Sequence, residues 1–330
     1  MENAVGAGVA AGRYSFLGPA GTFTEAALLQ VAPDASHLPM PDVITALDAV
    51  RRGDADRAVV PIENSVEGGV SATLDALTSG DPLVVVGEAL VEISFVLVAV
   101  PGTRLEDVRY VATHPHAWAQ CRGTLARLIP GVQHVPATST AAGAALLAEH
   151  AAGGEGDDGR EPGELGFEAA LVAAHSAASY GLEVLAEGVE DNRGAVTRFV
   201  VVARPGVVPP RTGADKTTLL VHLPNDDAGS LLTMLEQFAA RGVNLSRIES
   251  RPIGDALGRY AFSIDAEGHL ADERITATLQ GLHRVCPFVL FLGSYPRADR
   301  VSTAVATGTS DESFVAAQEW VAGLRRGLSR

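Results

Sequence analysis

The sequence predicts an α/β fold in two lobes, followed by a small α+β domain. Over residues 13–203, short apolar runs that end in polar turns alternate with helical patterns, which is the order of strands and helices in α/β folds. From Lys216 onward the order changes to strand, helix, strand, strand, helix, strand. This second order predicts a four-stranded antiparallel sheet with both helices on one face.

The first lobe is predicted from two strands that each end in a polar loop before a helix. The expected elements are strand 13–17, a helix after the hydroxyl caps of the turn 18–25, a helix near 43–52, strand 57–62, the polar loop 63–69 and a helix over 71–77. The carboxyl ends of neighbouring parallel strands are the usual place of a binding site. Both polar loops are therefore candidates for one.

The second lobe, over about residues 90–180, is reached through a long strand pair at 83–100 that is broken around 92–94. Its expected elements are strand 108–112, a helix after the turn that contains Pro115, strand 132–135, helix 139–149, strand 169–173, a helix that starts near His175 and strand 182–185. The chain then returns to the strand that contains Thr197. Two crossings between the lobes imply a hinge and a cleft.

The segments outside these elements are expected to be connections or ends. We expect a flexible leader at 1–12, an acidic Gly-rich surface loop at 153–164, a Pro-containing linker at 204–214, the small domain at 215–296, and a tail at 297–330 with a short helix. One face of that helix carries Phe314, Ala317, Val321 and Leu324. A four-stranded sheet with helices on one face needs cover on the other face or a partner at its edge, and a second copy would supply it.

The composition excludes several classes of protein. With 25 Lys and Arg against 40 Asp and Glu, the net charge of −15 argues against nucleic acid or an anionic membrane as a partner. The N-terminus lacks the basic region of a secretory signal, and no apolar run is long enough to span a membrane. Cys121 and Cys286 stand alone, so we expect no disulfide framework, no zinc motif and a cytoplasmic location. His114 and His116 flank a proline without a carboxylate, which does not favour a metal site.

The strand that begins at Thr197 has two polar side chains at its start and apolar residues after them. Side chains alternate along a strand, so Thr197 and Phe199 share one side while Arg198 and Val200 share the other. Such a strand is open at one end and buried at the other. The plain alternative is a structural strand in which the threonine serves β-propensity and the arginine is a solvated rim charge.

Four separated motifs, taken in order and spacing, resemble the prephenate dehydratase family. They are Phe16–Phe23 (FLGPAGTF), Pro61–Ser65 (PIENS), Thr113–Pro115 (THP) and Thr197–Phe199 (TRF). The domain that contains Glu249–Pro252 (ESRP) is similar to an ACT regulatory domain. The likeness covers roughly residues 13–296 and indicates the monofunctional form. It implies two α/β lobes similar to type II periplasmic binding proteins, with substrate in the cleft, and a ferredoxin-like (βαββαβ) ACT domain.

The resemblance also implies a reaction and the residues that serve it. Prephenate loses its ring carboxylate as CO2 and its ring hydroxyl as water, and the product is phenylpyruvate. The electron sink is internal, so no metal or other cofactor is expected. Thr197 carries the proton-donor role, but an aliphatic hydroxyl is a poor acid, so we expect a hydrogen-bond donor or relay.

Other residues follow from the same motifs. Arg198 is a candidate for binding a carboxylate of the substrate. If its side chain faces the other side of the strand, it stabilises the strand instead, and the N–H groups after Gly18, together with Ser65, are then expected to bind the carboxylate. Glu63 is either the proton source or a loop anchor. The expected substrate-binding positions are Thr22, Asn64, Ser65, Thr113 and Phe199.

The resemblance further implies that phenylalanine binds where two ACT domains pair, in a homodimer that is expected to pair again into a homotetramer. The expected effector positions are Gly229, Ser230, Leu231, Asn244, Leu245, Glu249, Ser250, Arg251 and Pro252. Residues 229–232 read GSLL where the family usually has GALV, which affects the fine specificity of this site. Two alternatives stay open: arogenate dehydratase, and a solute-binding module without catalysis, which would carry an export signal and no ACT domain.

Overall fold

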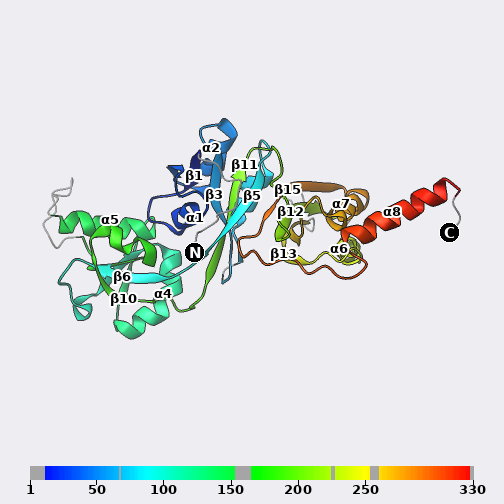
Figure 1. The fold of residues 1–330 in the computed structure, drawn as a ribbon. Coiled ribbons are helices and arrows are strands. Elements are labelled where there is room, and N and C mark those ends of the chain that lie inside the picture. The colour runs from blue at the N-terminus through cyan, green and yellow to red at the C-terminus, as the bar shows by residue number, and fades with distance from the viewer. Residues whose placement is uncertain (1–11, 67, 153–164, 224–226, 253–259, 328–330) are drawn as a thin grey trace. The chain divides into compact units, whose positions relative to one another are not determined.

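The computed structural model describes residues 12–66, 68–152, 165–223, 227–252 and 260–327 (Figure 1). The leader expected at 1–12 (except Gly12) and the acidic loop expected at 153–164 lie outside these residues. Among the residues that are described, no helix is both long enough and apolar enough to cross a membrane.

The described chain divides into two compact units. The first combines the residues up to Val70 with Ala89–Phe199, and the second combines Ser71–Glu88 with the residues from Val200 onward. Strands β5 and β11 each continue from one unit into the other. The linker expected at 204–214 lies inside the second unit.

The first sheet has the strand order β2-β1-β3-β11-β5, and the short strand β4 pairs with β3. Its strands and the helices between them are β1 (Arg13–Leu17), α1 (Phe23–Val31), β2 (Ser36–Met40), α2 (Val43–Arg52), β3 (Arg57–Asn64), β4 (Gly68–Gly69), α3 (Ser71–Thr78), β5 (Val84–Glu92) and β11 (Val196–Ala203). Strand β1 runs parallel to both β2 and β3, with Ser15 opposite Leu38 and Ala58. The carboxyl ends of β1 and β3 therefore lie at the same edge.

The second sheet has the order β10-β6-β9-β7-β8. Its elements are β6 (Phe95–Ala99), the 3-10 helix η1 (Leu105–Asp107), β7 (Tyr110–Thr113), α4 (Pro115–Leu128), β8 (Gln133–Pro136), α5 (Thr140–Ala151), β9 (Ala169–Ala173), the 3-10 helix η2 (Ala174–Tyr180) and β10 (Glu183–Glu187). Helix α4 packs through Cys121 and Leu125 on the face of the sheet that carries Leu97. Helix α5 packs through Leu147 on the face that carries Val98. Both faces are thus covered, which accounts for the uninterrupted burial of β6 and β9.

Helix starts in both lobes are fixed by side chains that the sequence places one residue before each helix. Thr22 accepts from Glu25 N, Asp42 from Thr45 N, and Ser139 from Ala142 N. His114 caps α4 through its ring nitrogen, with Pro115 in the first turn. These contacts satisfy N–H groups that have no partner within the helix.

The second unit contains a four-stranded antiparallel sheet in the order β13-β14-β12-β15. Its elements are β12 (Asp215–His222), α6 (Ser230–Ala239), β13 (Leu245–Pro252), β14 (Tyr260–Glu267), α7 (Glu273–Val285), β15 (Phe288–Pro296) and α8 (Asp311–Arg325). Met234 and Phe238 of α6 and Leu282 of α7 pack against Leu219 and Ile264, so both helices cover one face. This confirms the expected βαββαβ arrangement.

The other face of this sheet is partly covered by the same chain. Nζ of Lys216 lies 3.1 Å from both carboxylate oxygens of Glu88, and this ion pair is buried. Arg251 binds Ser71 and Asp75 on α3. The sequence had suggested a second copy as cover, whereas residues 71–88 provide part of it, because α3 and the start of β5 pack against this sheet within the second unit.

The two-lobed α/β fold and the α+β domain are confirmed, with four differences in detail. Strand β2 was not predicted, because Pro39 interrupts its pattern; it lies at the edge of the sheet, where proline is tolerated. Strand β4 was also missed, since it has only two glycines. The helix expected near His175 is the 3-10 helix η2. Strands β6 and β9 are antiparallel, so the second sheet is mixed.

Candidate active site

A cavity of about 370 Å³ in the first unit is lined by residues from both lobes. Apolar side chains form much of its wall, and hydroxyl, amide and imidazole groups line the rest. The lining residues include Leu17, Thr22, Phe23, Asn64, Phe95, His114, His116, Gln120, Ser139, Thr140 and Thr197. None of the lining residues carries a carboxylate, an ammonium or a guanidinium group.

Thr197 is held by Asn64 at the neighbouring strand end. Nδ2 of Asn64 donates to Oγ1 of Thr197 over 2.8 Å, and Oδ1 of Asn64 accepts from the backbone N–H of Val66, also over 2.8 Å. The second contact fixes which side of the amide is the donor. Oγ1 of Thr197 thus acts as an acceptor toward Asn64, and its own proton remains available for another acceptor.

Three helices begin at this cavity. Thr22 at the start of α1, His114 at the start of α4, and Ser139 at the start of α5 all line it. Helix N-termini carry partial positive charge and unpaired N–H groups, and both favour bound anions. The cavity can therefore attract a carboxylate although the chain has a net charge of −15 and the lining residues include no lysine or arginine.

The two histidines of the cavity, His114 and His116, contact each other. The ring of His114 stacks on that of His116 with 5.3 Å between centroids, and Nδ1 of His114 accepts from the backbone N–H of His116. Burial lowers the pKa of His114, and the neighbouring His116 and His134 lower it further. His114 is thus kept neutral at pH 7. With Nδ1 engaged as an acceptor, Nε2 carries the proton and can donate a hydrogen bond.

Arg198, Glu63 and Ser65 do not line the cavity. Nη1 of Arg198 lies 3.5 Å from Oε2 of Glu63. Ser65 exchanges two hydrogen bonds of 2.9 Å with the backbone of Val196, one through its N–H and one through Oγ. Since Thr197 lines the cavity, alternation along β11 directs Arg198 to the other side of the strand. These three residues join the ends of β3 and β11.

The remaining expected substrate positions fall into two groups. Thr22 lines the cavity, and its Oγ1 also donates to the carbonyl of Leu17 over 3.2 Å. Thr113 is fully buried and donates to the carbonyl of Leu171 across the second sheet. Phe199 is buried in β11 and does not line the cavity. Sequence position alone did not separate these cases.

Several lining residues were not singled out from the sequence. Phe23 and Phe95 pack edge to face, with ring centroids 5.3 Å apart, and form an aromatic wall. The hydroxyl residues at 138–140 form a third polar turn between a strand and a helix. Like the loops at 18–25 and 63–69, this turn consists of polar residues between a strand and a helix, so the sequence could have indicated it. Gln120 could not be assigned to the cavity from the sequence, because it lies within α4 and only the fold shows which side of that helix lines the cavity.

The expected effector positions are distributed over the sheet and helices of the second unit. Gly229 caps α6 with a φ of 93°, a conformation that favours glycine, and Ser230 and Leu231 begin the helix. Asn244 and Leu245 lie at the start of β13, and Ser250 and Pro252 lie exposed near its end. Glu249 and Arg251 lie on the face of the sheet opposite the helices, where Glu249 pairs with Arg247 at 3.2 Å. None of these positions lines the cavity of Thr197.

No group of three or more His, Cys, Asp or Glu side chains within the described ranges is placed to hold a metal ion. Cys121 and Cys286 are both free and buried. The residues that line the cavity of Thr197 offer hydrogen-bond donors, helix N-termini and imidazole groups.

Comparisons with known proteins agree with the motifs. The family model of prephenate dehydratase matches residues 14–206, and that of the ACT domain matches residues 217–284. A prephenate dehydratase of Amycolatopsis methanolica is 43% identical over 319 residues, which cover 96% of this chain and 98% of the relative. The solved structure of a prephenate dehydratase from Arthrobacter aurescens in complex with L-Phe gives a TM-score of 0.84 at 54% identity, covering 95% of this chain and 99% of that one. The structure of GqqA, a quorum quenching acylase, gives 0.73 at 31% identity, covering 86% and 98%.

Proposed function

Because the chain belongs to the prephenate dehydratase family, we propose that it converts prephenate to phenylpyruvate in the cavity of Thr197 and that phenylalanine regulates it through the ACT domain. The observation that carries the catalytic part is the contact between Asn64 and Thr197 at a cavity where three helices begin. It supplies a hydroxyl with a free proton beside groups that bind carboxylates.

The reaction needs little from the protein beyond positioning and one proton. As the bond between the ring and its carboxylate breaks, the electron pair moves through the ring, and the ring hydroxyl leaves with a proton as water. Thr197 donates the hydrogen bond to that departing hydroxyl, and the proton it relays is replaced from solvent. Phe23 and Phe95 provide an apolar surface for the ring that becomes aromatic.

The carboxylates of prephenate are bound by neutral groups in this proposal. The helix starts at Thr22, His114 and Ser139 provide N–H groups and partial positive charge. Neutral donors have an advantage for a reaction that expels CO2, because a full cation at the ring carboxylate would stabilise the ground state that must be lost. Arg198 then holds β11 against β3 through Glu63 and has no direct contact with substrate.

The cavity favours prephenate over arogenate. Arogenate carries an ammonium group where prephenate carries a keto oxygen, and a buried ammonium needs a carboxylate or several acceptors. The residues that line the cavity include no carboxylate. A keto oxygen instead accepts hydrogen bonds, which the hydroxyls and the Nε2–H of His114 can donate.

The activity is tested by incubating the purified full-length chain with prephenate and, separately, with arogenate. Phenylpyruvate should form from prephenate with a kcat/KM at least about tenfold above the kcat/KM for arogenate. This ratio corresponds to the cost of burying one polar group, the ammonium of arogenate, without a partner. Absence of phenylpyruvate would refute the proposed reaction. An equal or greater rate with arogenate would refute only the proposed preference for prephenate over arogenate.

The regulatory part rests on the ACT domain, on its exposed edge and on the L-Phe complex of the relative from Arthrobacter aurescens. Strand β13 lies at the edge of its sheet in the described chain, and the effector positions around it are largely exposed. Pairing of two such domains would cover that edge and bring the positions together, so we propose a homodimer through the ACT domain, with a homotetramer as its further assembly. Light scattering with and without phenylalanine tests both.

Regulation is best tested in the full chain. Cleavage after Pro210 would remove Lys216 and leave the carboxylate of Glu88 without its ammonium partner. Phenylalanine should raise the KM for prephenate, and prephenate should weaken phenylalanine binding by the same factor. Leu231→Glu, at an exposed effector position, should abolish phenylalanine binding and keep kcat within about twofold. If Leu231→Glu stayed fully inhibited, phenylalanine would act elsewhere.

A further inference from the structure

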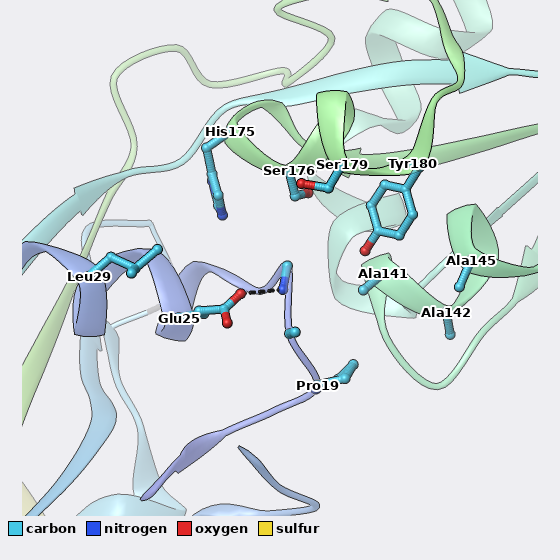
Figure 2. A pocket seen from close by; sticks show the side chains of 12 residues that line it. Pro19, Glu25, Leu29, Ala141, Ala142, Ala145, His175, Ser176, Ser179 and Tyr180 are labelled. Carbon is cyan, nitrogen blue, oxygen red and sulfur yellow. Dashed lines mark hydrogen bonds between the residues drawn. The ribbon is translucent and has the colours of Figure 1, made fainter. Parts of the chain in front are cut away.

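A second cavity, of about 420 Å³, lies in the first unit and shares no lining residue with the cavity of Thr197. Its walls are the turn at 19–21 and helix α1 on one side, and α5 and η2 on the other (Figure 2). Both lobes therefore contribute to it. The reaction proposed above uses none of its side chains.

Glu25 is the one charged side chain among the residues that line this second cavity. Its Oε2 accepts from the backbone N–H of Gly21 over 2.6 Å, a contact drawn in Figure 2. The side chain of Glu25 keeps about 20% of its surface exposed. Nδ1 of His37 lies 3.7 Å from the other oxygen, Oε1. A carboxylate offers about four acceptor sites, so these two neighbours leave capacity for a ligand.

Tyr180 and His175 face Glu25 from the second lobe (Figure 2). Burial raises the pKa of Tyr180, and the negative charge of Glu25 raises it further, so the phenol stays protonated. Burial lowers the pKa of His175, although its hydrogen bond with the carbonyl of Thr22 and the charge of Glu25 oppose the shift. The cavity therefore holds a carboxylate, a phenol and a neutral imidazole, with no resident cation.

Tyr180 also lies against the turn at 19–21, whose Gly21 N–H donates to Glu25. Gly21 has a φ of 82°, and a Cβ added at this position would meet Oη of Tyr180. The phenol of one lobe thus lies against the backbone of the other. Ser179, the neighbour of Tyr180, adds a hydroxyl to the same wall.

The rest of the wall is apolar and small. Leu29 of α1 lies on one side, and Ala141, Ala142 and Ala145 of α5 lie on the other (Figure 2). Alanines at these three positions leave the volume that a larger residue would fill. A ligand with one polar end and a compact hydrocarbon or aromatic body fits such a wall.

We propose that this second cavity binds a small primary ammonium compound with an apolar body. The three N–H groups of an ammonium match three acceptors here, the carboxylate of Glu25 and the hydroxyl oxygens of Ser179 and Tyr180. The apolar body lies against Leu29 and the alanines of α5. An anion is disfavoured by Glu25, and a neutral alcohol lacks the charge-assisted contact.

Occupancy of this cavity changes the affinity for substrate at the other one. The ligand contacts both lobes, and helices α1 and α5, which form part of its walls, begin at the cavity of Thr197. A ligand that binds better in one arrangement of the lobes shifts the population toward it. The predicted change in affinity for prephenate rests on the proposed function, whereas binding of the ammonium compound to the second cavity does not.

Binding is measured by calorimetry on the full chain with three probes of similar shape: 2-phenylethylamine, 2-phenylethanol and 3-phenylpropanoate. We expect 2-phenylethylamine to bind at least about tenfold more tightly than the other two, as one charge-assisted contact provides. Equal binding of the amine and the alcohol, or no binding of the amine, would overturn the proposal.

Variants locate the site. Glu25→Gln keeps an oxygen for the N–H of Gly21 and should weaken binding of the amine about tenfold. Ala145→Leu should block it by filling the cavity, independently of charge. Glu149→Gln, an exposed carboxylate on the same helix α5, is the matched control and should bind as the wild type does. If Glu25→Gln and Ala145→Leu, both folded by circular dichroism, bound the amine unchanged, the site would lie elsewhere. Because the experiment measures binding of the amine and not catalysis, its result is valid even if prephenate is not the substrate.

Discussion

Nδ2 of Asn64 donates to Oγ1 of Thr197 over 2.8 Å, and this contact joins the ends of strands β3 and β11 at the wall of the cavity. The two residues are 133 positions apart in the sequence. Because Val66 N–H holds the other end of the amide, Asn64 cannot turn its oxygen toward Thr197 without losing a hydrogen bond. The hydroxyl proton of Thr197 is thereby directed away from Asn64.

Replacement of Thr197 by valine removes the hydroxyl and keeps the shape of the side chain. We expect kcat for prephenate to fall by a factor on the order of 10², the usual range for loss of a proton-transfer contact. Thr197→Ser retains the hydroxyl and should keep a rate well above that of the valine variant. Steady-state kinetics measure the effect, and phenylalanine binding serves as the check on folding. A valine variant with more than about half the wild-type kcat would refute the assignment.

Arg198→Lys should affect the stability of the strand pair more than the binding of substrate. Lysine keeps the charge next to Glu63 but cannot reproduce the planar contacts of a guanidinium. We expect a lower Tm and a KM for prephenate within about threefold of wild type, because Arg198 does not line the cavity. Thermal unfolding and kinetics on the same preparation provide both values. A KM raised more than about tenfold at unchanged Tm would instead identify Arg198 as a carboxylate clamp.

Lys216 is the one lysine of the sequence, and it is buried against Glu88. Lys216→Met should lower the free energy of unfolding by about 3–5 kcal/mol, because the carboxylate of Glu88 stays buried without its ammonium. The double variant Lys216→Met with Glu88→Leu should recover part of this loss, which a double-mutant cycle by urea unfolding measures. In the folded protein Lys216 should resist acetylation by an amine-reactive ester. Rapid acetylation without unfolding would contradict its burial.

The stability of the protein should fall as the pH drops below about 6.5, the ordinary pKa of histidine. The pKa of His114 is lowered in the folded chain, so the unfolded chain binds this proton at a higher pH and protonation favours unfolding. The contribution is fully retained above the unfolded pKa and decreases below it. His114→Asn keeps an acceptor for the start of α4 without titrating, so its Tm should decrease less than that of wild type between pH 7 and pH 5. The exposed His283 provides the control His283→Gln. An unchanged pH dependence in His114→Asn would show that His114 does not titrate as stated.

The order of elements and most helix starts were determined by the sequence itself. Caps such as Thr22 and Ser139 act within one turn of the helix they begin, and the continuous apolar runs of β6 and β9 are a property of neighbouring residues. The motifs were also sufficient for the family, because they are short runs of adjacent residues. For the same reason the sequence placed Thr197 and Asn64 at strand ends.

Only the tertiary structure decided which of these residues meet. Ser65 belongs to the same motif as Asn64, and Thr113 begins another of the four motifs, yet both are used in backbone contacts. Arg198 turns away from the cavity that Thr197 lines. Residues 71–88 lie between two elements of the first lobe in sequence but pack with the second unit. The convergence of three helix starts on one cavity depends on parallel strand pairing over long separations. Local sequence pattern determines which side of an element is apolar, whereas the neighbours across that side are determined by the packing of the whole chain.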